Sequence, residues 1–188
     1  MNALASSRAT RETGVGASDI GEMTGGRDWQ ARYPEFCARA KGTNVNDRTL
    51  LATDYLNHVN EIIMLMELVP DAPECLEDCR AWQPMSYTEH FKASSIADRD
   101  LAIEAYPFSP PEFRGTFDRL IREMHRVIAG ALAGLEGATA QGDEERARRV
   151  VELAVRALKT MVDLASSTIH GEVQIMDQAE IDGLMDMM

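Results

Sequence analysis

Apolar residues recur every three to four positions over three long stretches of the chain, which is the spacing of one face of an α-helix. The clearest stretch covers residues 46–68, where the apolar positions gather on one broad side at about 100° per residue. A second stretch covers 109–136, and a third runs from 143 to 169 after a small-residue loop at 137–142. The first stretch has this predicted core face: Leu51, Tyr55, Leu56, Val59, Ile62, Ile63 and Met66.

Capping residues and prolines mark where these helices are expected to begin and end. Asn46 or Asp47 is the predicted cap of the first helix, which ends before Pro70 because proline disfavours a helical residue ahead of it. Ser109, with Glu112 three positions later, matches a capping box at the start of the second helix. Shorter helices are predicted at 28–42, 74–82, 86–93 and 96–106.

Every predicted element is helical, and the long helices are joined by connections too short for anything but antiparallel neighbours. We therefore predict an all-α protein, an antiparallel bundle of three to four main helices over residues 28–170. Residues 1–27, rich in Ser, Thr, Gly and Ala, are predicted to be a flexible leader. Residues 171–188 are predicted to be an amphipathic, partner-binding tail.

The charge of the chain restricts its partners more than its fold. The formal net charge of the 188 residues is −12, which disfavours binding to nucleic acid and to anionic membranes. No apolar run reaches the length of about 18 residues that suggests a membrane span, and the first residues lack the apolar centre of a secretion signal. The sequence therefore predicts a cytoplasmic protein with neither a nucleic-acid nor a membrane partner.

The three cysteines, Cys37, Cys75 and Cys79, include no CxxC pair. Their odd number and spacing favour neither a disulfide framework nor a zinc knuckle, so we expect reduced thiols. No glycine-rich phosphate loop or cofactor fingerprint is present either. We predict no metal site and no cofactor.

The face of the first helix opposite its core carries polar side chains in one narrow stripe. Spaced i, i+3, i+4 and i+7, they are Asp54, Asn57, His58 and Glu61. Exposed helix faces are usually polar, so a solvated surface is the simplest interpretation. Three apolar residues are expected to flank the stripe: Leu50, Met64 and Leu65. Mixed surfaces of this kind often dock a partner.

The tail carries acidic and apolar residues at helical spacing, and the peptide from Asp177 to Met185 resembles a known docking peptide. It is similar to the segment by which the flagellar motor switch protein FliM captures the chemotaxis response regulator CheY, and to the related tail of the chemotaxis phosphatase CheZ. The residues that match are Gln178, Glu180, Ile181, Asp182 and Leu184. Met185 shares a helical face with Ile181 and Leu184, so all six residues are predicted to bind the partner.

The resemblance implies a chemotaxis protein of two-component signalling whose partner is a phosphorylated CheY-like response regulator. In phosphatases that act on such regulators, an amide orients water at the aspartyl phosphate while an acid pairs with the regulator's lysine. Asp54-Tyr55-Leu56-Asn57 is similar to the acid-x-x-amide signature of these enzymes. The resemblance therefore implies Asp54 and Asn57 as catalytic residues of a protein phosphatase, with Mg²⁺ belonging to the partner's receiver domain.

Other interpretations of the polar residues stay open. His58 could serve phosphotransfer as an exposed imidazole, although the Lys and Gly that usually follow in such domains are absent. A metal-binding bundle could use the four histidines, which are His58, His90, His125 and His170. However, the Glu-x-x-His repeat of dimetal bundles is absent from the sequence. A non-catalytic adaptor of the regulator and a bundle completed by homodimerisation are the remaining alternatives.

Overall fold

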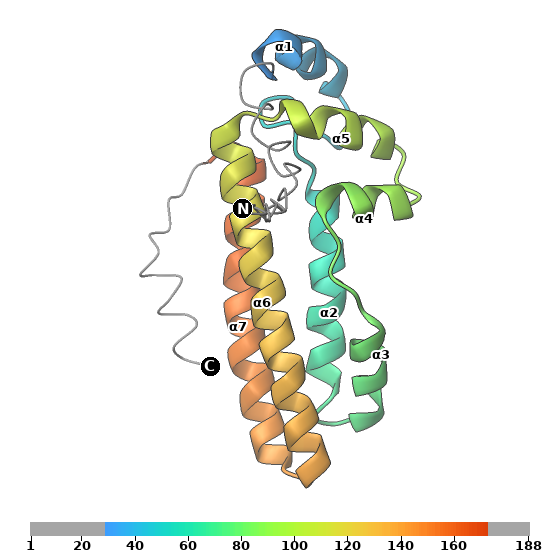
Figure 1. The fold of residues 1–188 in the computed structure, drawn as a ribbon, viewed down its shortest axis with the longest axis vertical. Helices are drawn as coiled ribbons and strands as arrows, with labels where there is room; N and C mark the ends of the chain where they lie inside the picture. Colours follow the sequence, from blue (N-terminus) through green and yellow to red (C-terminus); the bar gives the residue numbers. More distant parts are fainter. Residues whose placement is uncertain (1–28, 173–188) are drawn as a thin grey trace, which may run out of the picture.

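The computed structural model describes residues 29–172, which contain seven α-helices, three 3₁₀ turns and no strand (Figure 1). The all-α prediction is confirmed. The predicted leader and the partner-binding residues Gln178–Met185 lie outside the described residues. The elements are α1 (Trp29–Ala40), η1 (Thr53–Tyr55), α2 (Leu56–Leu68), η2 (Pro73–Cys75), α3 (Leu76–Ala81), α4 (Tyr87–Ala93), α5 (Arg99–Ala105), η3 (Tyr106–Phe108), α6 (Pro111–Gln141) and α7 (Glu144–Ile169).

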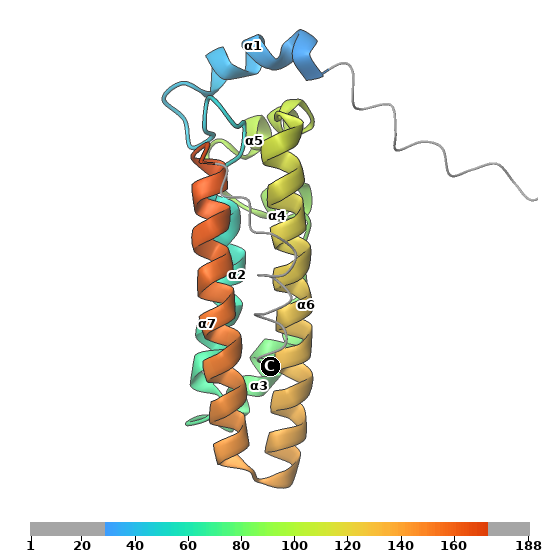
Figure 2. The same cartoon turned by 90° about the vertical axis from the view of Figure 1, so that its left-hand side faces the viewer.

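Helices α6 and α7 form a long antiparallel hairpin and lie side by side in both views (Figures 1 and 2). With 31 residues, α6 is about 46 Å long at 1.5 Å per residue. It continues to Gln141, so the predicted loop at 137–142 is wrong for most of its length. Gly137 stays helical, and the helix ends only at Gly142, whose φ of 66° an L side chain rarely adopts. Asp143 then caps α7 by accepting a hydrogen bond from the Arg146 amide.

Helix α2 packs along α7, and Figure 2 shows it behind the α6–α7 pair. All seven residues of the predicted core face at 46–68 are buried, although Leu51 and Tyr55 precede α2. Helix α1 lies across one end of the bundle, against α5 and η3. Pro34 lies inside α1 without interrupting it. No helix in the described part of the chain is both long enough and apolar enough to cross a bilayer.

The start of the first long helix differs from the prediction. Residues 46–52 form a turn, and regular helix begins only at Leu56. The Asn46 side-chain oxygen accepts hydrogen bonds from the amides of Arg48 and Thr49, as a helix cap would, but no regular helix follows. Leu50 has φ 58° and is completely buried, so it does not flank the polar stripe as predicted.

Two Ser-x-x-Glu sequences, at 86–89 and 109–112, match the capping-box pattern, and only the first forms one. Ser86 caps α4, since its hydroxyl accepts from the Glu89 amide while the Glu89 carboxylate accepts from the Ser86 amide. Ser109 makes no cap for α6, which starts after Pro110 without a side-chain cap. The Ser109 hydroxyl is buried instead, because the chain is extended there and carries it into the interior.

Candidate functional site at the start of α2

The predicted catalytic pair lies at the start of α2, on the side where α4 approaches it. Asp54 is half-buried in η1, and Asn57 is exposed one turn later. Asn57 lines a groove of about 380 Å³, whose other lining residues are His58, Glu61, Met85, His90, Ala93 and Ser94. Burial and the nearby His58 lower the pKa of His90, and Asp54 lies close enough to oppose this shift without lining the groove itself. Asn57 therefore borders the groove, while Asp54 lies behind its His90 wall.

His58 does not have the exposed position that phosphotransfer requires. Its ring is only 4% exposed and stacks on Trp82, with 4.5 Å between the ring centroids. Its Nε2 lies 2.9 Å from the main-chain oxygen of Gln83. Because a carbonyl oxygen only accepts, this nitrogen carries the proton and is occupied. The predicted exposure of His58 is wrong. The amphipathic pattern of α2 could not indicate its burial, because the segment 82–86, from another part of the chain, covers the face of α2 that carries His58.

Three hydrogen bonds fasten the segment between α3 and α4 to α2. One joins His58 to the Gln83 carbonyl, and in a second the Trp82 indole donates to the main-chain oxygen of His58 at 3.1 Å. In the third, the Tyr55 hydroxyl donates to the main-chain oxygen of Met85 at 2.6 Å. These contacts fix Met85 against α2, where it forms part of the groove wall.

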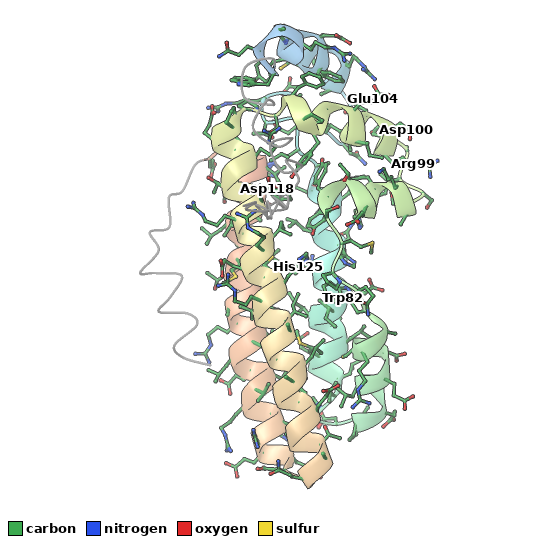
Figure 3. All side chains as sticks on the ribbon, in the orientation of Figure 1. Trp82, Arg99, Asp100, Glu104, Asp118 and His125 are labelled. Atoms are coloured by element: carbon green, nitrogen blue, oxygen red, sulfur yellow. The ribbon has the colours of Figure 1, made fainter. Side chains whose placement is uncertain are left out.

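The fold brings together three histidines that are far apart in the sequence. The ring of His90 lies 5.7 Å from that of His58, and His125 on α6 lies 6.0 Å from Trp82, both measured between centroids. Figure 3 shows Trp82 and His125 in the space between α2 and α6. Burial lowers the pKa of all three imidazoles, and the proximity of His58 lowers those of His90 and His125 further.

This histidine cluster is not arranged as a metal centre. Within residues 29–172, no group of three or more His, Cys, Asp or Glu side chains is placed to hold a metal ion. The fourth histidine, His170, is exposed at the end of α7. The rings instead pack on aromatic neighbours: Tyr55 lies 5.4 Å from His90, between centroids. The metal-binding alternative thus gains no support from the described residues.

The end of α7 lies beside the loop that leads into η1. The Thr49 hydroxyl donates to the main-chain oxygen of Ile169 at 2.6 Å. Gly171 packs so closely on Arg48 that an added Cβ would lie 3.2 Å from the Arg48 Cδ. The chain therefore leaves the described fold, at Glu172, on the side of the bundle where the Asp54 turn begins.

The sequence pointed to the polar stripe that contains Asn57 and Glu61, which line the groove, and Asp54, which does not, but it did not reveal the other wall. Met85 and His90 come from the α3–α4 connection and from α4. Their only sequence signal is their position within or near a short capped helix, which carries no information about α2. Trp82 was also missed, although a half-buried tryptophan in a proline-bounded connection commonly anchors that connection.

No family model matches this chain, and comparison with curated proteins and with solved structures yields no match.

Proposed function

We propose that this chain binds a phosphorylated response regulator of the CheY type and promotes its dephosphorylation. Residues Gln178–Met185 would bind the regulator, Asn57 would act on its aspartyl phosphate, and Asp54 would assist. The observation that carries the proposal is the exit of the chain at Glu172, beside the loop that leads into Asp54. The described chain thus ends near the loop that leads to the catalytic pair, although more than a hundred residues separate the two in the sequence.

The reach of the tail is compatible with this arrangement. Gln178 lies six positions after Glu172, and an extended chain of six residues spans at most about 22 Å. A short tether of this kind holds a bound partner at an effective concentration on the order of millimolar. Weak binding through the tail is therefore sufficient to bring the regulator repeatedly to the groove at Asn57.

Hydrolysis of the aspartyl phosphate mainly requires the protein to position the attacking water. Water attacks the phosphorus atom of the aspartyl phosphate, the bond to the carboxylate oxygen breaks, and the products are inorganic phosphate and a free carboxylate. An exposed amide that holds this water in line reduces the entropic part of the barrier. Asn57 is exposed and adjacent to a groove, which suits such a role. Asp54 would pair with a lysine of the regulator, whose receiver domain supplies Mg²⁺.

Replacing Asn57 with alanine tests the catalytic proposal. We expect Asn57→Ala to slow dephosphorylation of the regulator by on the order of 100-fold, the effect of removing one well-aimed donor. Asn60→Ala is the matched control, because Asn60 is also exposed on α2 but does not line the groove. The measurement is release of inorganic phosphate from a phosphorylated CheY-like receiver domain at saturating concentration of the full chain.

If Asn57→Ala dephosphorylated the regulator at the wild-type rate, the proposed catalytic role of this groove would be refuted. If binding persisted in that case, the chain would be an adaptor of the regulator. A second variant, Ile181→Asp with Leu184→Asp, tests the docking part. We expect it to weaken regulator binding at least tenfold without unfolding the helices of residues 29–172, and unchanged binding would refute docking through the tail.

A further inference from the structure

A second groove lies between α6 and α7, in the half of the hairpin nearer to its turn at Gly142. Its cavity volume is about 310 Å³, roughly twice that of a cavity of ~150 Å³ that holds a benzene ring. Only α6 and α7 line it, so it opens away from α2. It exists because α6 has glycine at positions 130 and 134: a Cβ on Gly134 would lie 3.2 Å from a Val150 methyl carbon.

The charge of this groove is positive at its rim. Arg146 and Arg149 line it together with the apolar Val150 and Leu153, and no carboxylate residue does. Arg146 forms no ion pair within the described chain, whereas Arg149 pairs with Glu145. The neighbouring grooves differ, because Glu61 lines the groove beside α2 and Asp118 lines the one beside α4. An acidic ligand is therefore repelled less at the α6–α7 groove than at either of these.

The chain itself contains a segment with the complementary composition. Residues 173–188 have no basic side chain and four acidic ones: Asp177, Glu180, Asp182 and Asp186. The α6–α7 hairpin, residues 111–169, has nine acidic and nine basic residues, so the negative charge of the protein is not concentrated there. If the segment were helical from Asp177, it would place three apolar residues on one face: Ile181, Leu184 and Met185.

The length of this segment matches the distance to the groove. Five extended residues from Glu172 to Asp177 cover about 17 Å, which equals about eleven residues of α7 at 1.5 Å each. Twelve helical residues, 177–188, then add about 18 Å. A tail running back along α7 would therefore span the levels of about residues 159 to 147. Arg149, Val150 and Leu153 lie within that interval, and Arg146 lies at its end.

We infer that residues 177–188 dock as a helix in the groove between α6 and α7 of the same chain, with their apolar face on Val150 and Leu153, Asp186 at the level of Arg149, and the last turn of the docked helix beside Arg146 and Arg149. The negative end of the docked helix dipole would also point toward these two arginines. Docking would bury Ile181 and Leu184, which the proposed function assigns to the regulator. The regulator would then have to displace the tail from its own bundle, an autoinhibitory device that rests on the proposed function. The docking of the tail in this groove does not depend on the proposed function.

Hydrogen exchange on the full chain at micromolar concentration tests the docking without any regulator. We expect amides of 178–188 to exchange at least tenfold more slowly than in a synthetic peptide of the same sequence. Arg146→Glu with Arg149→Glu should remove this protection. The matched control is Arg80→Glu with Arg148→Glu, an equal charge change at two exposed arginines that do not line the groove, and it should retain the protection. Circular dichroism verifies that both variants fold.

Three results would overturn the docking. One is exchange in the full chain as fast as in the free peptide, and another is protection that survives the charge reversal at Arg146 and Arg149. The third is protection that disappears on dilution, because it would come from the tail of a second copy. A further variant, Ile181→Asp with Leu184→Asp, leaves the groove intact and should abolish the protection as well.

Measuring regulator binding distinguishes a failure of the tail docking from a failure of the proposed function. If about nine-tenths of the tails are docked, releasing them by Arg146→Glu with Arg149→Glu should tighten regulator binding about tenfold. Protection in the wild type, with no regulator binding either by the wild type or by the variant whose tail is released, would leave the docking standing and refute the proposed function. Equal binding by the wild type and this variant, with no protection in either, would refute the docking and leave the proposed function standing.

Discussion

Replacing His58 with phenylalanine isolates the contribution of one buried imidazole to stability and to its pH dependence. Phenylalanine keeps an aromatic ring at the position that stacks on Trp82. It removes the Nε2 proton that bonds the Gln83 oxygen, and it removes one of three titratable rings in the histidine cluster. The hydrogen bond and the titration have separate effects, because the first acts at every pH and the second only in acid.

The effect at neutral pH follows from the hydrogen bond. A buried acceptor that loses its donor costs about 1–3 kcal/mol. Gln83 is exposed, so water can reach part of its main chain and the cost should lie at the lower end. We expect His58→Phe to lower the free energy of unfolding by about 1–2 kcal/mol at pH 8.

The effect in acid has the opposite sign. Burial lowers the pKa of His58, His90 and His125, so below about pH 6.5 the unfolded chain binds protons that the folded chain does not. The free energy of unfolding therefore falls as the pH drops below that value. Each histidine that stays neutral contributes at most about 1.4 kcal/mol per pH unit to this slope. His58→Phe removes one contribution and the repulsion that a charged His58 exerts on the other two rings.

Urea denaturation between pH 8 and pH 5.5, followed by circular dichroism and tryptophan fluorescence, measures both effects. The variant should be less stable than the wild type at pH 8, and the difference should shrink steadily as the pH falls. His170→Gln is the control, because His170 is exposed and lies outside the cluster, and it should follow the wild type within about 0.5 kcal/mol. A constant difference between the His58→Phe and wild-type curves at every pH would refute the argument.

The remaining predictions concern the connection between α3 and α4 and the glycines of α6. Tyr55→Phe should lower the free energy of unfolding by about 1–1.5 kcal/mol in the same urea assay, since it removes the hydrogen bond to the Met85 oxygen; no change would mean that water replaces the bond. Gly115→Ala should raise the free energy of unfolding by about 0.5–1 kcal/mol, because an added Cβ meets nothing within 4 Å in α6. Gly142→Ala should lower it by about 1–2 kcal/mol, because its φ of 66° strains an L side chain. Equal effects of the two glycine substitutions would refute this conformational reasoning.

The sequence predicted the helices well where periodicity is long and failed where the backbone leaves the helical conformation. The burial of seven apolar residues was predicted correctly because they repeat at helical spacing, although Leu51 and Tyr55 precede α2. The turn before η1 was predicted wrongly, because Leu50 adopts a left-handed φ of 58° directly after the turn that Asn46 caps. The end of α6 was placed too early, because Gly137 is compatible with a helix interior and only Gly142 needs the left-handed conformation.

By itself, the sequence determined the helical class, the residues of the core and the polar character of Asp54, Asn57 and Glu61, since each of these depends on spacing within one element. It could not determine that His58 is buried, because the residues that cover it, Trp82 and Gln83, come from another element. Only the tertiary structure decided that three distant histidines share one cluster and that α7 ends beside the loop before Asp54. Such contacts depend on how separate helices pack together, and no periodicity along a single helix records that arrangement.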